Sequence, residues 1–222
     1  MKMKDIVIVG SGGLGREVKW LIDECNREQK RWNFLGWISN EEPGTVIAGY
    51  PILGTEEWIL QRKKEIDVAI AIGNGPRRNR VVSYLGDKDF ISYPVIISPS
   101  AEMSDSVVLG RGSIITAKSI LTVDIKAGEF FFCNLACTVG HDCVIGDYVT
   151  LNPGVNLSGN VELGDFVTIG TGAAVIQGLF IGEHTIVGAG ASVIRDIEAN
   201  VTAVGVPARP ITQKNSGSSR TE

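Results

Sequence analysis

One histidine of this chain is a candidate base, with a solvent-exposed corner histidine as the alternative. His141 is one of only two histidines, and Asp142 follows it directly. An imidazole changes charge near neutral pH, so it can remove a proton from an attacking amine or hydroxyl group. A neighbouring carboxylate can fix the tautomer of the ring and stabilise its protonated form. Because adjacent residues of a strand face apart, the sequence leaves open whether Asp142 reaches His141 within one chain.

A glycine-rich loop near the start of the sequence has the spacing of a phosphate-binding turn. Gly10, Gly12 and Gly15 lie between a short apolar run and a helical pattern. Glycines let the backbone approach phosphate oxygens, and a helix N-terminus offers unpaired N–H groups to negative charge. The loop predicts binding of a nucleotide-linked acceptor, with a nicotinamide dinucleotide and a purely structural turn as alternatives. The residues expected to line this site are Gly10, Ser11, Gly12, Gly13, Ser39 and Asn40.

The elements that position this loop alternate between strands and helices. Strands are expected at 6–9, 34–38, 68–72 and about 91–97, and helices at 15–27, 55–64 and 77–85. Strands separated by helices of this length predict an α/β domain with a parallel, Rossmann-like sheet. The second strand ends in Ser39-Asn40 rather than in an acidic residue that would grip a ribose, which disfavours a dehydrogenase.

The second half of the chain obeys a six-residue rule. In fifteen successive hexads from Leu109 onward the first residue is apolar, and the fifth is apolar or small. A longer period of three hexads is superimposed on the six. A repeat of this kind predicts a parallel β-helix of about five coils, whereas a sandwich of alternating strands would space its turns irregularly. The glycines at the three-hexad spacing, which mark one corner of the coil, are Gly110, Gly128, Gly146, Gly164 and Gly182.

The hexad register assigns a direction to the histidines and cysteines. His141 is third in its hexad and points out of the prism, while His184 takes an outward corner position for which we expect no catalytic role. Zinc needs ligands that converge on one point. Because Cys133, Cys137 and Cys143 fall on inward positions, buried thiols are the better interpretation and no metal site is expected.

Two phenylalanines fall on outward positions of the same repeat. Phe130 and Phe132 flank the inward Phe131. Exposed aromatic side chains of this kind predict a contact with another subunit. A cover by the N-terminal domain is the alternative.

Composition and charge restrict the class of protein. The chain has 222 residues and a formal net charge of −4, which gives no electrostatic reason to expect a nucleic acid or an anionic membrane as partner. The longest uncharged window, 166–182, contains four glycines and is too short and too polar to span a bilayer. The start lacks the layout of a signal peptide, so the four cysteines indicate reduced thiols in a cytoplasmic protein.

Several of these motifs together resemble a known family. The hexads Ile145-Gly146-Asp147 and Leu163-Gly164-Asp165, the His141-Asp142 pair and the closing Gly205-Val206-Pro207-Ala208-Arg209-Pro210 are similar to the hexapeptide acyltransferases. With the glycine loop ahead of the repeat, residues 4–211 resemble the two-domain sugar acetyltransferases of the sialic-acid O-acetyltransferase and bacillosamine-pathway N-acetyltransferase group. The resemblance implies a left-handed β-helix, a homotrimer and acetyl-CoA as donor.

The resemblance also implies roles for individual residues. His141, with Asp142, matches the catalytic base, and Asn134 matches a residue that orients the acceptor. Gly159, one coil after His141, matches the position whose backbone N–H meets the thioester carbonyl. Ala174 and Ala189 are expected in the coenzyme A groove. A side chain that caps its own loop is the alternative for Asn134, and a plain corner residue is the alternative for Gly159.

The sequence therefore predicts an acetyl-CoA-dependent enzyme that acetylates an amino group of a nucleotide-linked sugar. Alternatives are O-acetylation by the same family and a non-catalytic trimer that binds a nucleotide sugar. Many relatives carry histidine where this chain has Leu14 and Thr150, and acidic residues where it has Ser39-Asn40, so the sugar and the nucleotide stay open. We expect an acceptor-binding domain at 1–98, a β-helix at 99–211 and an unstructured tail at 212–222.

Overall fold

The structure is a computed structural model of the chain and describes residues 3–211. Its first part is a six-stranded sheet with the order β3-β4-β2-β1-β5-β6, in which only the β3–β4 pair is antiparallel. The sheet is the predicted Rossmann-like one. The elements are β1 Lys4–Val9, α1 Gly13–Glu28, β2 Trp32–Ile38, β3 Val46–Ile47, β4 Tyr50–Gly54, α2 Glu56–Arg62, β5 Ile66–Ile70, α3 Gly75–Leu85 and β6 Ile91–Ser92.

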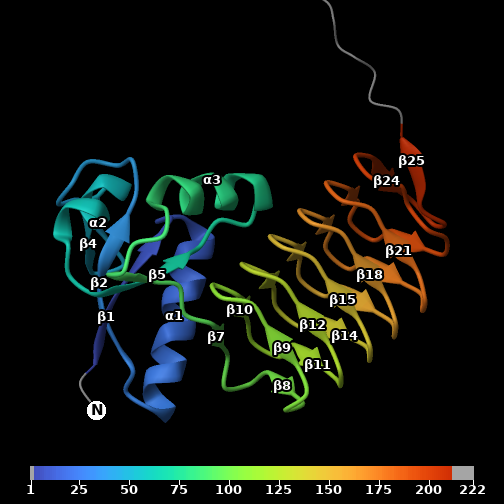
Figure 1. Cartoon of the computed structure of the whole chain (residues 1–222), viewed down its shortest axis with the longest axis horizontal. Coiled ribbons are helices and arrows are strands. Elements are labelled where there is room, and N and C mark those ends of the chain that lie inside the picture. Colours follow the sequence, from blue (N-terminus) through green and yellow to red (C-terminus); the bar gives the residue numbers. More distant parts are fainter. Residues whose placement is uncertain (1–2, 212–222) are drawn as a thin grey trace, which may run out of the picture.

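The apolar alternation of β1 explains how the helices cover the sheet. Ile6 and Ile8 face α1, whereas Val7 and Val9 face the layer that contains α2 and α3. Each helix therefore buries one apolar stripe against the strands, and all four β1 side chains are at most 3% exposed. In Figure 1, α1 lies between the sheet and the stack of coils.

Two details of this half differ from the sequence prediction. The β3–β4 hairpin was not expected, because its strands are short and contain Pro51 and Gly54. The single strand expected at 91–97 is wrong. Pro94 interrupts it, so that β6 joins the sheet whereas β7 (Ile96–Ile97) pairs with a strand of the second half.

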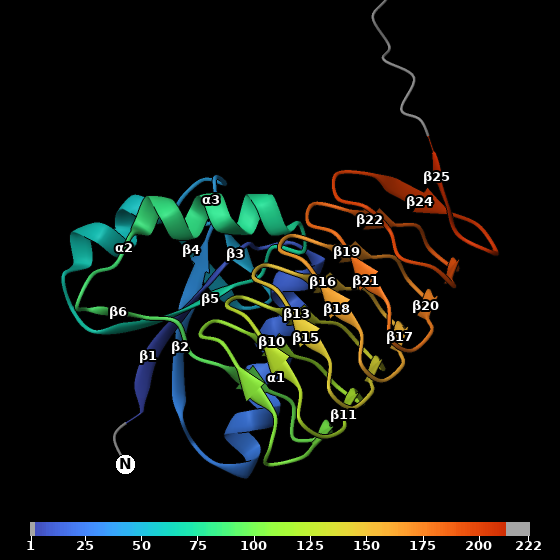
Figure 2. The same ribbon diagram turned by 45° about the vertical axis from the view of Figure 1, so that its right-hand side comes forward.

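The second part is a left-handed parallel β-helix with three flat faces (Figure 2). The first face contains β7 Ile96–Ile97, β10 Ile114–Ile115, β13 Phe132–Cys133, β16 Thr150–Leu151, β19 Thr168–Ile169, β22 Ile186–Val187, β24 Thr202–Val204 and the antiparallel β25 Arg209–Ile211. The second face contains β8 Glu102–Met103, β11 Ile120–Leu121, β14 Thr138–Val139, β17 Asn156–Leu157, β20 Ala174–Val175 and β23 Ser192–Val193. The third face contains β9 Val108–Leu109, β12 Lys126–Ala127, β15 Val144–Ile145, β18 Glu162–Leu163 and β21 Phe180–Ile181.

The predicted register is confirmed through Val193. Strand partners lie three hexads apart, as in Ile114 with Phe132, and the predicted inward positions form the continuous core of the prism. The spacing then becomes shorter, because Ile181 pairs with Ile197 and Ile186 pairs with Thr202. The last coil is therefore two residues shorter than the uniform repeat predicts.

The corners of the coil are formed by residues with left-handed backbone rather than by the glycines at the three-hexad spacing. The fourth residue of every hexad from Gly112 to Gly190 has a positive φ, and most of these residues are not glycine. The glycines at the three-hexad spacing instead allow close approach along the axis. A Cβ on Gly146, for example, would lie 2.7 Å from the backbone nitrogen of Asp165 on the next coil.

The coil has three edges, which we name by their residues. The Asn134 edge (116–118, 134–136, 152–154, 170–172, 188–190) joins the first face to the second. The His141 edge (122–124, 140–142, 158–160, 176–178, 194–196) joins the second face to the third. The aromatic edge joins the third face back to the first and stacks Phe130, Tyr148, Phe166 and His184 with ring centroids 4.6–5.3 Å apart.

The N-terminal sheet and its helices cover the beginning of the first face. Phe130 and Phe132 are only 1% and 2% exposed, because Phe132 packs in the cluster of α1 and Trp37 while Phe130 packs in the cluster of α3. The expectation that they are exposed for a subunit contact is wrong, and the alternative of a cover by the N-terminal domain is confirmed. The tail predicted at 212–222 lies outside the described residues.

Candidate active site

The His141 edge holds the predicted base in a defined orientation. Nδ1 of His141 lies 2.8 Å from Oδ2 of Asp142, so the carboxylate reaches the ring within one chain. The backbone of Asp142 is left-handed, with φ of 59°, and this corner geometry brings two adjacent side chains together where a straight strand would separate them. A carboxylate can only accept a hydrogen bond, so the contact places the proton on Nδ1 and leaves the lone pair on Nε2.

Gly159 lies directly against this ring, one coil further along the same edge. A Cβ on Gly159 would lie 2.4 Å from Nε2 of His141 and 2.5 Å from Cε1, so a side chain at this position would force the ring or the coil to shift. Within residues 3–211 no hydrogen bond uses the Gly159 N–H. The edge therefore combines an imidazole, a carboxylate and a free backbone donor, with the imidazole 64% exposed on the surface of the single chain.

Gly10 of the glycine loop lines a separate cleft at the carboxyl ends of β1 and β2, whereas the predicted residues Ser11, Gly12 and Gly13 are not among its lining residues. The cleft has a volume of about 560 Å³. Gly15 packs so tightly on the loop that a Cβ would lie 2.0 Å from the carbonyl oxygen of Gly10, which explains the third glycine of the motif. Gly12 is the N-cap of α1 and offers no side chain to the first turn. The lining residues are Val9, Gly10, Ile38, Ser39, Asn40, Glu56, Glu57, Ile72, Arg77, Arg80, Val81 and Tyr84.

An acidic residue that the sequence analysis missed lies beside the loop. The Ser11 hydroxyl contacts Oγ of Ser39 and Oε1 of Glu41, both at 3.1 Å. The sequence analysis placed Ser39-Asn40 where an acidic residue follows the second strand of a dinucleotide-binding fold, but Glu41, at the end of the turn 39–41, supplies that carboxylate. Glu41 lies only two residues after Ser39, so a search of the few residues beyond the strand end would have found this carboxylate.

Two helices supply the opposite walls of this cleft. Arg77 and Arg80 come from α3, and Glu57 comes from the first turn of α2. The Tyr84 hydroxyl donates to Glu57 at 2.7 Å, and hydrogen bonds from Thr55 and Tyr84 hold the pKa of the Glu57 carboxyl below its usual value. The cleft therefore presents cations near the glycine loop and a carboxylate at α2.

The remaining predicted residues lie on other parts of the β-helix. Asn134 and Ala189 are on the Asn134 edge, and Ala174 begins β20 on the second face. The side-chain oxygen of Asn134 accepts from the backbone N–H of Leu135 at 2.8 Å, which is the loop-capping alternative; a role in orienting the acceptor stays a prediction.

One chain does not bring the predicted site together. The first face packs on the N-terminal sheet, and the His141 edge is the edge opposite that face. The glycine cleft, His141 and Asn134 therefore occupy three separate regions of the chain. In the single chain His141 is exposed, Asn134 is half-buried, and the cleft is open to solvent.

Leu14 and Thr150, where many relatives carry histidine, lie side by side. Oγ1 of Thr150 donates to the carbonyl oxygen of Gly73 at 2.7 Å, and a Cβ on Gly73 would lie 3.7 Å from Cδ2 of Leu14. Both residues thus border the segment between β5 and α3, next to Ile72 of the cleft. Where many relatives place two histidines, this chain places a methyl-rich and a hydroxyl side chain.

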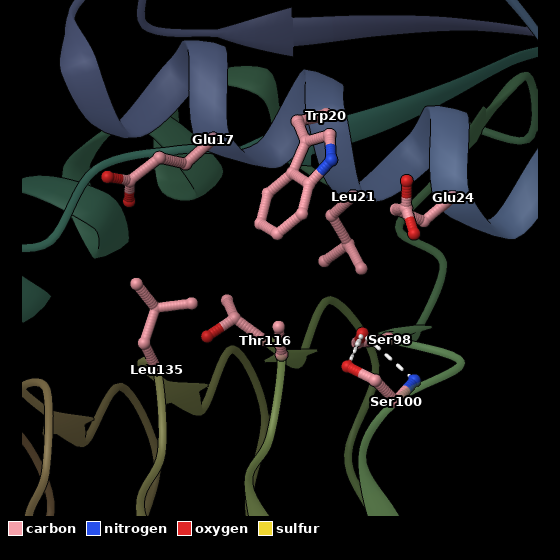
Figure 3. Close-up of a pocket in the computed structure, with 9 residues that line it drawn as sticks. Glu17, Trp20, Leu21, Glu24, Ser98, Ser100, Thr116 and Leu135 are labelled. Atoms are coloured by element: carbon pink, nitrogen blue, oxygen red, sulfur yellow. Dashed lines mark hydrogen bonds between the residues drawn. The ribbon is translucent and has the colours of Figure 1, made fainter.

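A further small groove runs between α1 and the first coils (Figure 3). In this view Trp20, Leu21 and Glu24 face Ser98, Ser100 and Thr116 across a space of about 20 Å³. It contains none of the predicted site residues, and its volume suffices for a solvent molecule rather than a substrate.

The cysteines are part of the core. Cys133, Cys137 and Cys143 are fully buried, as the register predicts, and burial raises the pKa of the Cys143 thiol. Within residues 3–211 no group of three or more histidine, cysteine or acidic side chains could hold a metal ion. In the same range no helix is long and apolar enough to cross a membrane.

Comparison with known proteins gives consistent relatives. A family model described as the PglD N-terminal domain matches residues 5–85. The GDP-perosamine N-acetyltransferase of Escherichia coli O157:H7 is 32% identical over 159 residues, which cover 68% of this chain and 69% of that protein.

Solved structures match over almost the whole chain. WeeI from Acinetobacter baumannii AYE has a TM-score of 0.85 and 37% identity, and the match covers 95% of this chain and 100% of that one. The perosamine N-acetyltransferase from Caulobacter crescentus has a TM-score of 0.85 and 30% identity, with coverage of 95% and 98%. It was solved with CoA and GDP-perosamine as variants in which a histidine is replaced by asparagine or by alanine.

Proposed function

This chain belongs to the family of nucleotide-sugar N-acetyltransferases that carry a PglD N-terminal domain, and on that premise we propose that it acetylates the amino group of a nucleotide-linked amino sugar. It is an acetyltransferase that uses acetyl-CoA as donor. The observation that carries the proposal is the imidazole of His141, held at Nδ1 by Asp142 and packed at Nε2 against Gly159.

The glycine cleft is the proposed site for the nucleotide of the acceptor. The free N–H groups at the start of α1 and the guanidinium groups of Arg77 and Arg80 match the negative charge of a diphosphate. Glu41, Ser11 and Ser39 match the hydroxyl groups of a ribose. Gly10, Gly12, Gly13 and Asn40 complete the proposed site.

The proposed chemistry is a direct attack on the thioester. The acceptor amine forms a C–N bond with the carbonyl carbon, and Nε2 of His141 takes the proton that the amine loses. The carboxylate of Asp142 stabilises the imidazolium that forms. As the C–S bond breaks, the imidazolium returns the proton to the departing sulfur. The Gly159 N–H is the proposed donor to the oxyanion, and Ala174 and Ala189 leave space for coenzyme A.

Thiol release measures this activity directly. The chain is expected to release CoA from acetyl-CoA in the presence of GDP-perosamine or a UDP-linked amino sugar, and far more slowly with the corresponding sugar that carries a hydroxyl in place of the amine. Mass spectrometry should find one acetyl group on the amine of the acceptor. Absence of thiol release with every amino-sugar nucleotide would contradict the proposal, and release with the hydroxyl sugars alone would assign O-acetylation instead.

A homotrimer is the proposed assembly, because it would bring His141 of one chain to Asn134 of another. A head-to-tail contact that closes into a ring places the His141 edge of one chain against the Asn134 edge of the next. Exposed apolar side chains on the second and third faces and on the His141 edge support a buried contact there. They are Val108, Ile120, Val123, Val144, Ile176, Phe180 and Ile194.

Sedimentation equilibrium tests this assembly. The wild-type chain is expected at three times the mass of one chain, and Val144→Asp is expected to dissociate it and remove activity, because a charge cannot be buried there unpaired. Val46→Asp is the control, since Val46 is exposed, at 66%, but lies on β3 of the N-terminal sheet, away from both edges of the proposed contact. A monomeric wild type, or a Val144→Asp variant that stays trimeric, would contradict the assembly.

We also propose a cytoplasmic location and a division of labour between residues 1–98 and 99–211. All four cysteines are free thiols and buried, which suits a reducing compartment. The glycine cleft lies in the first range and the His141 edge in the second. The first range would hold the acceptor, and the second would hold the donor and the base.

A further inference from the structure

Arg78 is the one arginine within residues 3–211 that is almost completely buried. It lies on α3 and is 1% exposed. No carboxylate pairs with it in the described range of the chain. Burial lowers the pKa of Arg78 to about 10, so the guanidinium stays charged at neutral pH. Its charge must therefore be stabilised by other groups.

Oxygen atoms from both halves of the chain surround the guanidinium. From the β-helix, Nε donates to the Phe130 carbonyl at 3.0 Å and Nη2 donates to the Tyr148 carbonyl at 2.9 Å. From the segment between β5 and α3, the Ile72 and Gly73 carbonyls accept from Nη1 at 2.6 and 3.3 Å. Nη2 also contacts the Val149 carbonyl and Oγ1 of Thr150, both at 3.2 Å.

The contacts to Phe130 and Tyr148 enclose the coil that carries the base. Phe130 and Tyr148 are consecutive residues of the aromatic edge, one coil apart, and His141 lies between them in sequence. Within the described residues no backbone N–H donates to either carbonyl. Arg78 thus supplies the hydrogen bonds that these two corner carbonyls would otherwise lack beneath the N-terminal domain.

The contacts to Ile72 and Gly73 hold one wall of the glycine cleft. Ile72 lines the cleft, and Arg77 lines it from the position next to Arg78. Gly75 lies so close to the β-helix that a Cβ would be 2.4 Å from the Tyr148 carbonyl oxygen. Arg78 therefore connects the wall of the cleft to the His141 coil, beside the Thr150–Gly73 hydrogen bond and the Gly75–Tyr148 contact.

We propose that Arg78 is a positioning residue for acetyl transfer, which fixes the nucleotide cleft relative to the coil that carries His141. This inference rests on the proposed function, because acetyl transfer to a sugar bound through its nucleotide requires a fixed distance between the cleft and His141. In the proposed trimer the β-helices pack on one another, so a cleft fixed on one β-helix is also fixed relative to the base of its neighbour.

The choice of arginine supports orientation rather than packing alone. Replacing a buried charge by an apolar side chain of similar volume is often neutral or stabilising. An apolar side chain fills space, however, without directing bonds at named carbonyls. Five donors in a planar fork fix the angle between two elements as well as their distance.

The test compares two acceptors in three variants. With the best amino-sugar nucleotide, Arg78→Met is expected to lower kcat by about 10²-fold, because a displacement of about 1 Å is enough for that loss. With a small free amine that does not use the cleft, its thiol-release rate is expected to stay within about twofold of wild type. Arg78→Lys keeps the charge and should recover part of kcat. Arg27→Met, at an exposed arginine of α1, is the control expected to match wild type.

Three outcomes would overturn the inference. One is an equal loss with both acceptors, which indicates general destabilisation. The second is an unchanged kcat in Arg78→Met with the nucleotide sugar. The third is measured by hydrogen exchange and needs no activity: the backbone amides of residues 77 and 78, which donate to Asn74, are expected to exchange at least about tenfold faster in Arg78→Lys than in wild type. Unchanged exchange overturns the role of Arg78 even if the wild-type chain acetylates no acceptor, and this separates its failure from that of the proposed function. If Arg78→Met does not fold, Arg78→Lys carries both measurements.

Discussion

His141→Ala is expected to lower kcat for acetyl transfer by about 10²–10⁴-fold while the chain stays folded. The ring is 64% exposed in the single chain and makes one hydrogen bond, to Asp142, so its removal leaves the core of the prism intact. What is lost is the group that accepts the proton of the attacking amine. Thiol release at saturating acetyl-CoA and acceptor measures the effect on kcat directly.

The controls separate catalysis from binding and folding. The variant is expected to keep the sedimentation mass of wild type, and CoA is expected to raise its melting temperature as it does for wild type. His184→Ala is the matched substitution of the other histidine, which stacks on Phe166 at the aromatic edge, away from the base. A His141→Ala variant with near-wild-type kcat for its best acceptor would remove His141 from the mechanism.

Gly159→Ala is expected to lower kcat by a comparable amount, of about 10²-fold, for a steric reason. The new methyl group would lie 2.4 Å from Nε2 of His141, so the ring or the coil must shift. Gly159 has no positive φ, which means that alanine fits the backbone and the clash with the ring is the main effect. The displaced imidazole would no longer reach the acceptor amine.

A double-variant cycle isolates that clash. In the His141→Ala background the ring is absent, so adding Gly159→Ala should cause little further loss of kcat and a smaller loss of thermal stability than in wild type. Fully additive effects on both kcat and melting temperature would show that Gly159 does not act through the ring.

The regular part of the fold could be predicted because its signal repeats. The inward positions, the parallel pairing and the burial of the three core cysteines all follow from a hexad pattern that is sampled many times. The sequence prediction failed only at the end of the array, where no later hexads follow to show that the spacing has changed. There the turn before Ile197 is two residues shorter, and the apolar residue that the hexads place at a fifth position pairs instead with Ile181.

The parts that could not be predicted depend on contacts between distant segments or on backbone geometry. Whether Phe130 is exposed is decided by α3, which lies much earlier in the chain, and no periodicity within the repeat records that cover. The contact between His141 and Asp142 requires the left-handed corner at Asp142, which the alternation rule for strands excludes. Glu41 was missed because a turn, rather than the strand end itself, carries the acidic side chain to the loop.

The three-hexad register also restricts how the chain can change its length. An insertion of one or two residues inside the array would turn inward side chains outward in every later coil, whereas an insertion of a whole coil would keep each face in place and lengthen the prism by about 4.8 Å. Each coil contacts only the coils beside it, so such a step leaves the His141 coil and its Arg78 connector unchanged. Homologues of different length are therefore expected to differ by whole coils between positions 112 and 190, with other differences confined to edges and ends. The last coil, which is two residues shorter, is followed only by the antiparallel β25 within the described residues, so its changed spacing shifts no later coil.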